Sequence, residues 1–464
     1  MNYEESVRGL LALGRELAAP RQPAQSSAAG AQIHKFGLKN IETLSASLGD
    51  PHRAVPCAHI AGTNGKGSTA AMLESILRTA GLRTGLYTSP HLERVNERIR
   101  LNGEDVSDGD FAAAWTLVHS KIESLMASGA LAAHPTYFEC VTAMAFLIFA
   151  QKKLDLAVYE VGLGGRLDST NIVMPEVAVI TSIDFDHEGL LGHSIAEIAS
   201  EKAGIIKPGI TVVSSAERPE ARTVIAERCR QLDARLIEID STYRVRFTHF
   251  IDGRYPAIAM PRRGSGGILR LEPPLPGRFQ VRNALAAATA ARVLAERGFP
   301  LSDENIELGI RSAYWPGRLE KLSDHPTVYL DGTHNPAGAR ELVGFWEENF
   351  SGGRIFLVYG TVRDKAVDEI AGLLFPHAEH VILTAPRQPR AISAEVLAEM
   401  AGHLAPSFVV EADPQKALER ALEMAFADDA VFATGSLYLV GEWRAYWRNR
   451  KTASRGPAEI LDSE

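Results

Sequence analysis

The residues with the clearest chemical potential form a glycine-rich run around one lysine, Gly62-Thr63-Asn64-Gly65-Lys66-Gly67-Ser68. An apolar strand is expected before this run, over 55–61, and a helix after it, over 70–79. Glycines let successive backbone N–H groups face an anion, the start of a helix adds partial positive charge, and a lysine can reach terminal phosphates. The strict Walker spacing is not met, because its first glycine is missing and Gly67 separates Lys66 from Ser68. A plain strand-to-helix turn would leave Lys66 unexplained, so the run predicts a phosphate-binding loop.

Acidic residues and a histidine close two further apolar runs. Glu160 ends one run, and Asp184, Asp186 and His187 follow the next. Because the carboxyl ends of parallel strands gather at one edge of a sheet, these side chains are expected beside the phosphate loop, where Mg²⁺ and ATP oxygens belong. If the two strands are neighbours, about 4.8 Å apart, Glu160 and His187 can share a cation. A histidine ligand is unusual for Mg²⁺ and suggests that Mn²⁺ is also accepted. Each acid taken alone can equally be a helix cap or a turn former.

A second glycine cluster, over 162–168, matches a dinucleotide-binding turn only in part. Leu167 occupies the position at which the GxGxxG pattern needs its last glycine, and no crossover helix is expected to begin there. The dinucleotide interpretation is therefore rejected. Arg166 and Asp168 remain as charged residues on a backbone that glycine allows to approach a ligand.

The whole chain alternates short apolar runs with helical stretches, which is typical of a parallel sheet with crossover helices. Between about 241 and 276, short alternating runs separated by Pro and Gly predict a small antiparallel excursion. We predict an α/β fold with a large P-loop ATPase domain on a mostly parallel sheet and a smaller, Rossmann-like C-terminal domain. The strands are expected at 55–61, 82–88, 156–161, 177–183, 211–214, 328–330, 355–359, 380–383, 408–410 and 430–433.

A stretch that contains Pro316 and Gly317 ends a helix and precedes a new strand, so it is a candidate linker. The predicted division is an N-terminal domain over 1–312, a linker over 313–318 and a C-terminal domain over 319–464.

Polar residues also follow the first strand of the predicted C-terminal domain. Asn335 and Pro336 are suited to be the N-cap and the first residue of a helix. Asp331 and His334 have no such structural explanation. Ser436, which follows the last expected strand, is a weak signal by itself.

Composition excludes several classes of protein. The chain has 464 residues, of which 45% are hydrophobic and 23% charged, as in an average globular protein, so wholesale disorder and fibrous repeats are excluded. The formal net charge of −8 argues against nucleic acid as the main partner, but it allows a local cationic pocket for a small anion.

The remaining sequence features favour a soluble, cytoplasmic protein. Cys57, Cys140 and Cys229 are widely spaced and predict neither a disulfide framework nor a zinc site. The N-terminus is expected to form an amphipathic helix and lacks the pattern of a signal peptide. The longest apolar run, over 141–150, is about half the length that a membrane span requires. A flexible loop is expected over 20–32.

Ten motifs in a fixed order resemble those of folylpolyglutamate synthase/dihydrofolate synthase, a family of ligases within the Mur ligase superfamily. The resemblance runs from about residue 36 to 443. It implies a large ATPase domain, a short linker and a smaller α/β domain, with ATP in the cleft between them. The motifs are GTNGKGS at 62–68, TSPHL at 88–92 with ERI at 97–99, TYFE at 136–139, EVGLGGRLDSTN at 160–171, DHEGLLG at 186–192, EKAGIIK at 201–207, NA at 283–284, PGRLE at 316–320, DGTHNP at 331–336 and TGSLYLVGE at 434–442.

The same resemblance implies roles for individual residues. The loop 62–68 with Lys66 is the implied phosphate site, and two Mg²⁺ ions are implied, one held by Ser89 and Glu160 and one by His187 and Glu160. The other implied contacts are ATP for Asn283, Arg318, Asp331 and His334, the pterin substrate for Asp168, and glutamate for His334 with Ser436.

Lys202 lies in a helical stretch, over 194–206, directly after the His187 loop. An ammonium group that points into a site already holding Lys66 and divalent cations is repelled. Carbamylation by CO₂ makes it an anion, and the resemblance implies this modification. The alternative is that Lys202 points outward and pairs with Glu197 or Glu201.

The predicted function is ATP-dependent ligation of L-glutamate to dihydropteroate, to reduced folates, or to both. A bifunctional enzyme is favoured, and a monomer is expected. The alternatives are a Mur-type ligase for a UDP-sugar peptide and a regulator that binds ATP without catalysis. Only 61 residues precede Gly62, which argues against the separate UDP-binding domain of the first alternative.

Overall fold

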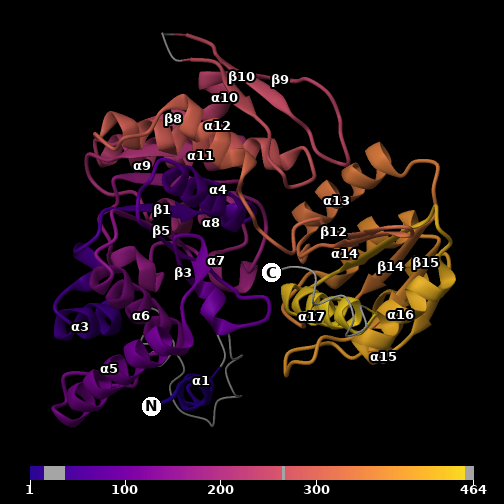
Figure 1. Cartoon of the computed structure of the whole chain (residues 1–464), viewed down its shortest axis with the longest axis horizontal. Coiled ribbons are helices and arrows are strands. Elements are labelled where there is room, and N and C mark those ends of the chain that lie inside the picture. Colours follow the sequence, from indigo (N-terminus) through magenta and orange to yellow (C-terminus); the bar gives the residue numbers. More distant parts are fainter. Residues whose placement is uncertain (15–36, 264–266, 455–464) are drawn as a thin grey trace, which may run out of the picture.

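The computed structural model describes residues 1–14, 37–263 and 267–454, and these ranges form three sheets with their helices (Figure 1). The expected loop at 20–32 lies outside them. Among the described helices, none is both long and apolar enough to span a bilayer.

The largest sheet has eight strands in the order β4-β3-β2-β5-β1-β6-β7-β8. The six strands from β2 to β8 in this order run parallel, whereas β3 and β4 are antiparallel. Every residue of β1, β2, β5, β6 and β7 is buried, as expected for parallel strands covered on both faces. The strands are β1 (Cys57–Ala61), β2 (Thr84–Tyr87), β3 (Ile99–Leu101), β4 (Glu104–Asp105), β5 (Leu156–Glu160), β6 (Val177–Ile180), β7 (Thr211–Ser214) and β8 (Arg235–Glu238).

The expectation that the strands before Glu160 and His187 are neighbours is wrong. Strand β1 lies between β5 and β6, with Ile60 paired to both Glu160 and Val179. The phosphate loop, which follows β1, is therefore flanked on one side by Glu160 and on the other by the loop that carries His187.

Helices cover both faces of this sheet. Ala58 and Ile60 of β1 pack with α4, α11 and α12, whereas Cys57 packs on the other face with α6 and its neighbours α1, α3 and α5. Helices α8 and α9 cover the rest of that second face. These helices are α1 (Tyr3–Ala12), α3 (Lys39–Ser47), α4 (Lys66–Thr79), α5 (Asp108–Ala127), α6 (Tyr137–Gln151), α7 (Glu188–Leu191), α8 (Ile195–Ala203), α9 (Pro219–Gln231), α10 (Ile239–Thr242), α11 (Phe279–Glu296) and α12 (Asp303–Arg311).

The predicted antiparallel excursion is present as a three-stranded sheet, at the top of Figure 1. Its central strand pairs antiparallel with both neighbours. The strands are β9 (Tyr243–Phe247), β10 (Ala257–Pro261) and β11 (Leu269–Leu271).

A six-stranded sheet forms the C-terminal part in the order β12-β13-β17-β14-β15-β16. All its strand pairs are parallel except β12 with β13. Tyr329 and Phe432 stack at 5.2 Å in its core. The elements are β12 (Glu320–Asp324), β13 (Thr327–Leu330), α13 (Pro336–Asn349), β14 (Ile355–Tyr359), α14 (Val367–Leu374), β15 (His380–Leu383), α15 (Ala394–Ala401), β16 (Phe408–Val410), α16 (Pro414–Met424), β17 (Ala430–Thr434) and α17 (Leu437–Ser454).

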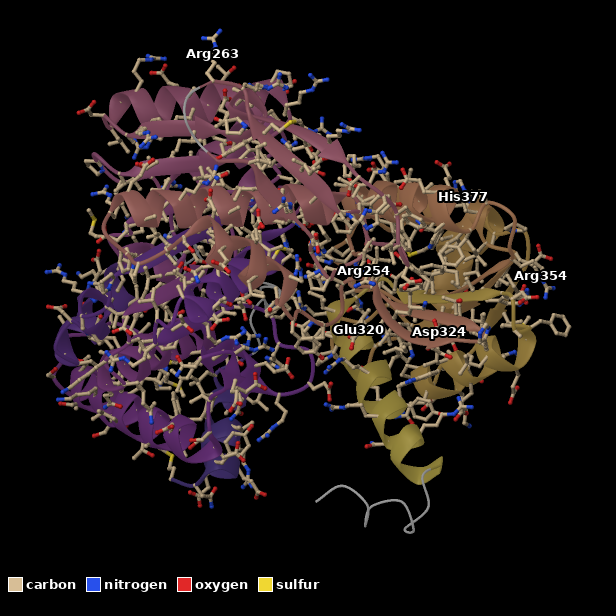
Figure 2. All side chains as sticks on the ribbon, turned by 45° about the horizontal axis from the view of Figure 1, so that its top comes forward. Arg254, Arg263, Glu320, Asp324, Arg354 and His377 are labelled. Atoms are coloured by element: carbon tan, nitrogen blue, oxygen red, sulfur yellow. The ribbon has the colours of Figure 1, made fainter. Side chains whose placement is uncertain are left out.

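The connection between the two larger sheets is fixed by Glu320, at the start of β12. Its carboxylate accepts hydrogen bonds from the Gly317 N–H at 2.9 Å and from the Arg444 guanidinium of α17 at 2.9 and 3.1 Å. Figure 2 shows Glu320 near the junction of the two parts and Asp324 at the other end of the strand. The predicted domain boundaries at 312 and 319 fall within this connection and remain a prediction.

Candidate active site

The phosphate loop joins β1 to α4, and α4 begins at Lys66 rather than at the expected residue 70. Gly65 is the N-cap with φ of +84°, where a side chain would be strained and its Cβ would lie 2.3 Å from the Asn283 amide oxygen. The Lys66 Nζ donates to the carbonyl oxygens of Gly62 and Thr63, each at 3.0 Å. The ammonium is thus held over the loop at the start of a helix, where an anion is favoured.

The end of β6 braces this loop from the side. The hydroxyls of Thr181 and Ser182 donate to the Asn64 carbonyl at 2.8 and 3.1 Å, and the Thr63 N–H donates to the Ser182 carbonyl at 2.7 Å. A Cβ on Gly62 would lie 1.8 Å from the Thr181 hydroxyl, so glycine is required there. These hydrogen bonds fix the phosphate loop to the segment that follows β6.

Glu160 and Asp184 lie around the same cavity as the loop but in different surroundings. Glu160 is 3% exposed and accepts one hydrogen bond from the Ser89 N–H at 3.2 Å. Burial raises the pKa of Glu160 to about 7, against the opposing pull of Lys66. Asp184 instead pairs with Arg218 at 2.8 Å and with Arg340 at 3.4 Å, so it positions side chains more than it offers free oxygens.

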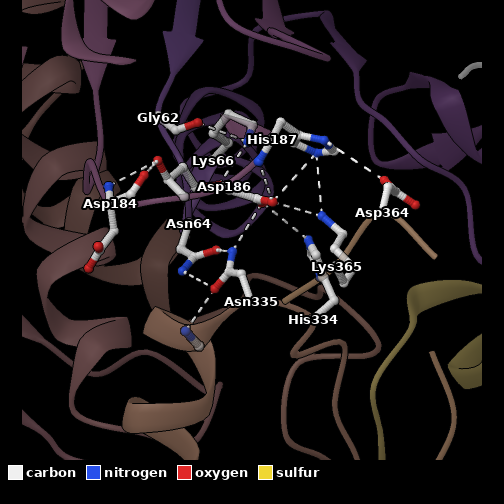
Figure 3. Close-up of polar contacts among 12 residues, drawn as sticks. Gly62, Asn64, Lys66, Asp184, Asp186, His187, His334, Asn335, Asp364 and Lys365 are labelled. Atoms are coloured by element: carbon white, nitrogen blue, oxygen red, sulfur yellow. Dashed lines mark hydrogen bonds and ion pairs between the residues drawn. The ribbon is translucent and has the colours of Figure 1, made fainter. Parts of the chain in front are cut away.

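Asp186 is the centre of a polar cluster that joins the two parts of the chain (Figure 3). Its carboxylate lies 2.8 Å from the Lys365 Nζ, 3.7 Å from the His334 Nε2 and 3.8 Å from the His187 Nε2. Burial opposes its charge, but Lys365 and the two histidines outweigh burial and hold the pKa of Asp186 well below its usual range. Burial and Lys365 lower the pKa of His187 to about 4 and that of His334 to about 3. Both imidazoles are therefore neutral at pH 7, and the lone pair on the His187 Nε2 faces the Lys365 Nζ at 3.4 Å.

Sequence reasoning missed Lys365. It lies in the loop after β14, and its side chain is only 7% exposed. The polar run 363–365, soon after a strand on the sheet edge that carries Asp331 and His334, was the available signal.

We expect Lys365→Met to destabilise the protein far less when Asp186→Asn accompanies it. Removing one partner of a buried ion pair leaves the other charge uncompensated, and a coupling energy of about 1–3 kcal/mol is expected for such a pair. Thermal unfolding of the two single variants and the double variant, without nucleotide or metal, measures this energy. Lys321→Met is the matched control, because Lys321 pairs with the exposed Asp324. Additive effects of the two changes would contradict the inferred pair.

Asn64 and Asn335 form a second link between the two parts. Each amide donates to the other, at 3.1 and 2.9 Å, and Asn335 also donates to Asp186 at 3.2 Å. The predicted cap is confirmed, since the Asn335 side chain accepts from the Gly338 N–H at 2.8 Å and Pro336 is the first residue of α13. Capping alone was too narrow an interpretation, because the same side chain also contacts the phosphate loop.

Lys202 points inward, so the outward alternative is wrong. It is 4% exposed, and its Nζ donates to the Gly62 carbonyl at 2.8 Å. Glu201 pairs with Arg166, and Glu197 accepts from the N-cap of its own helix. Burial and the charge of Lys66 lower the pKa of Lys202 to about 7.

Three of the expected nucleotide contacts, Asn283, Arg318 and Asp331, come from α11, from the connection before β12 and from the end of β13. The Asn283 amide donates to Gln280 at 3.0 Å. Arg318 is partly buried, and this burial lowers its pKa. Both oxygens of Asp331 accept backbone N–H groups, from Leu319 and Thr333, at 2.9 Å each. Asp331 therefore shapes its own loop, whereas the Arg318 guanidinium lines the cavity.

Two cavities meet at this site. The first, of about 760 Å³, is lined by the phosphate loop and by the other expected nucleotide and metal residues, Ser89, Glu160, His187, Lys202, Asn283, Arg318, Asp331 and His334. The second, of about 720 Å³, is lined by Tyr137, Phe138, Leu163, Asp168, Leu190, Lys365, Arg390 and Ser436, among others. Ser89, His187 and His334 line both cavities. The structure thus brings together every site residue expected from the sequence, around two adjoining spaces.

Asp168 lines the second cavity, but its oxygens are engaged within its own loop. They accept from the N–H groups of Gly162, Leu163 and Thr170, each at 3.0 Å, and from the Thr170 hydroxyl at 2.5 Å. Through these hydrogen bonds, Asp168 holds the glycine-rich loop in place beside the cavity.

Two family models match the chain, one over the part with the eight-stranded sheet and the other over the part with the six-stranded sheet. The family model of the Mur ligase middle domain matches residues 60–291, and that of the Mur ligase, glutamate ligase domain matches residues 317–437. The dihydrofolate synthase/folylpolyglutamate synthase of Bacillus subtilis is 36% identical over 420 residues, which cover 88% of this chain and 94% of that protein. The chain belongs to the folylpolyglutamate synthase/dihydrofolate synthase family. It is an ATP-dependent ligase of the Mur type, and the predicted fold class is confirmed.

Solved structures of this family have the same architecture. Folylpolyglutamate synthase of Mycobacterium tuberculosis, complexed with ADP and AMPPCP, matches with a TM-score of 0.83 and 33% identity over 90% of this chain and 97% of that one. Escherichia coli FolC in complex with DHPP and ADP matches with a TM-score of 0.82 and 30% identity over 97% of this chain and 99% of that one. A probable bifunctional folylpolyglutamate synthase/dihydropteroate synthase of Halobacterium salinarum is 38% identical, and the chain spans about half (53%) of its length.

Proposed function

We propose that this chain joins the amino group of L-glutamate to the carboxylate of dihydropteroate and of reduced folates, using ATP. The observation that carries the proposal is the meeting of the two cavities at Ser89, His187 and His334. One cavity holds the phosphate loop, and the other has the apolar and aromatic lining that suits a pterin acid. A carboxylate in the second cavity therefore lies next to a phosphoryl group in the first.

Ligation through an acyl phosphate requires the acid and the γ-phosphate of ATP to lie side by side. A carboxylate is a poor electrophile, so one of its oxygens first attacks the γ-phosphorus of ATP, and ADP leaves. The amino group of glutamate then attacks the carbonyl carbon of the acyl phosphate, and phosphate leaves with the carboxylate oxygen while the amine loses a proton. Lys66 stabilises the charge that develops on the transferred phosphoryl group, and the rigid loop keeps its backbone donors in place.

The residues around the junction fit Mg²⁺. Glu160 has one free carboxylate oxygen, Ser89 has a hydroxyl and His187 is neutral, and Mg²⁺ characteristically takes few protein ligands and completes its shell with phosphate oxygens and water. We propose Ser89 with Glu160 for one ion. For a second ion we propose His187 with Glu160, which would meet across the phosphate loop that follows β1, because β5 and β6 are not neighbours. The ions supply charge neutralisation on the phosphate oxygens.

We expect His187→Ala to raise the Mg²⁺ or Mn²⁺ concentration that gives half-maximal rate about tenfold or more, the scale of losing one metal-supporting group. Initial rates over a metal titration at saturating ATP measure this value. The matched control is His193→Ala, because His193 is an exposed histidine in the next loop. If the metal concentration for half-maximal rate is unchanged, His187 does not bind the metal, and its role is structural, within the Asp186 cluster.

The remaining assignments extend this proposal. Asn283, Arg318, Asp331 and His334 would position ATP, Asp168 would act on the pterin through the loop that it fixes, and His334 with Ser436 would receive glutamate. The domain division at 312 and 319, a monomeric state and a cytoplasmic location remain predictions.

The two acid substrates are distinguished by a product assay. The purified protein receives ATP, Mg²⁺ and glutamate with either dihydropteroate or a reduced folate, and the ligated product is measured by mass spectrometry. The proposal expects both products. Turnover of one acid alone would reject bifunctionality, and ATP binding with turnover of neither would favour the regulator alternative.

A further inference from the structure

A separate group of potential metal ligands lies on the outer helix α5. It consists of His119 and Glu123 of α5 and His134 in the loop that leads to α6. One ligand atom from each side chain lies within 4.8 Å of those of the other two, and within the described ranges no other three His, Cys, Asp or Glu residues converge so closely. None of the three lines either cavity. Figure 1 shows α5 at the lower edge of the molecule, away from the six-stranded sheet.

Local structure already orients the two histidines. His119 and Glu123 are four residues apart and therefore share one face of the helix. The His134 Nδ1 lies 2.8 Å from the Pro135 carbonyl oxygen. Because a carbonyl can only accept, Nδ1 carries the proton, and the Nε2 lone pair is left for a metal.

The other two side chains lack competing partners. The His119 ring stacks on buried Trp115 at 5.2 Å with an angle of 21°, and its Nδ1 is buried without a hydrogen-bond partner among the described residues. Glu123 is exposed and forms no ion pair with any residue in those ranges. A carboxylate beside two imidazoles, without an ion-pair partner among the described residues, is a donor set that a metal completes.

We propose that His119, Glu123 and His134 bind one divalent transition-metal ion, with Zn²⁺ as the best match. Two imidazoles and one carboxylate, with water in the fourth position, form a common zinc donor set. In a tetrahedral site with bonds of about 2.0–2.1 Å, ligand atoms lie about 3.3 Å apart. Rotations of the exposed Glu123 side chain and of the two imidazole rings would bring the three atoms from within 4.8 Å to this spacing. The ion would tie α5 to the loop before α6, whose first turn lines the second cavity.

The test uses full-length protein freed of metal by a chelator, without nucleotide, and titrated with Zn²⁺ in a calorimeter. We expect wild type to bind one equivalent that the double variant His119→Ala/His134→Ala loses, whereas His193→Ala and His187→Ala keep it. Because His187 belongs to the ligase site, zinc binding that persists in His187→Ala occurs at a different site. A few degrees of rise in Tm are expected for wild type at about a hundredfold excess over Kd, but not for the double variant.

Two further readouts protect the test from a folding artefact. Glu123→Gln changes an exposed side chain and should weaken Zn²⁺ binding at least tenfold without changing the Tm of the metal-free protein. Cu²⁺ should quench part of the tryptophan fluorescence of wild type, because the Trp115 ring lies against His119, and Glu123→Gln should need a higher Cu²⁺ concentration for the same loss. Equal zinc stoichiometry and affinity in wild type, the double variant and Glu123→Gln would overturn the proposal.

Discussion

Replacement of Lys66 by alanine is expected to lower kcat by about 10² or more, the scale of losing one preorganised charge stabiliser. The Lys66 ammonium lies at the start of α4 and is held by two carbonyl groups of its own loop. Burial lowers its pKa, and Glu160 and Asp186 oppose this shift. The loss should be larger in kcat than in the KM for the acid, because that acid is proposed to bind in the other cavity. Initial rates of product formation at saturating ATP measure the effect.

Two controls separate chemistry from folding. Lys152→Ala removes a lysine whose partner is the exposed Asp110, and it should leave kcat unchanged. Circular dichroism and thermal unfolding of Lys66→Ala should show the same fold. The small cost is the loss of one hydrogen bond at the Thr63 carbonyl and one at the Gly62 carbonyl, which keeps its bond from Lys202. Near-normal product formation by Lys66→Ala would remove Lys66 from the mechanism.

The second large effect is expected at Lys202. We propose that its amine reacts with CO₂ to form a carbamate, with release of one proton. With a pKa of about 7, roughly half of the side chains are neutral at pH 7, whereas a lysine with the usual pKa of about 10.4 is almost wholly charged. The carbamate keeps one N–H, so the hydrogen bond to the Gly62 carbonyl can persist.

Lys202→Ala should be slow, and acetate or another small carboxylate should restore part of the rate by filling the vacated space. Lys207→Ala is the matched control, since Lys207 also donates to a backbone carbonyl but outside the site. Full activity of Lys202→Ala, or a variant that no added anion helps, would count against the carbamate.

The amount of carbamate on Lys202 is expected to rise with pH. A proton competes with CO₂ for the amine, so carbamate content should fall as pH falls through about 7. A ¹³C NMR titration of wild type with labelled bicarbonate measures it, and Lys202→Ala identifies the signal. If the carbamate signal appears only at a pH near the pKa of free lysine, the pKa of Lys202 is not lowered as the structure indicates.

The buried strands could be predicted from the sequence because burial on both faces leaves a nearly continuous apolar run. The expected ranges 211–214, 355–359 and 380–383 agree with β7, β14 and β15 residue for residue. Strands such as β8 and β12 were missed, because their exposed, charged sequences carry no such signal.

The order of strands and the contacts between the two parts could not be predicted in this way. Local patterns placed Glu160 and His187 at one edge, but they do not encode that β1 lies between the two strands. Lys365 meets Asp186 across 179 positions, and Asn335 meets Asn64 across 271. Such contacts depend on how the two sheets face each other, which no short segment specifies.

Transfer of oxygen-18 tests the central claim, that the acid is activated as an acyl phosphate, most directly. The acid substrate is labelled in its carboxylate and incubated with the protein, ATP, Mg²⁺ and glutamate, and the released phosphate is analysed by mass spectrometry. Direct attack of the carboxylate on the γ-phosphorus predicts one labelled oxygen in each phosphate, with phosphate and ligated product formed in equal amounts and only when acid and glutamate are both present. Unlabelled phosphate, or phosphate release that is indifferent to acid and glutamate, would contradict this account.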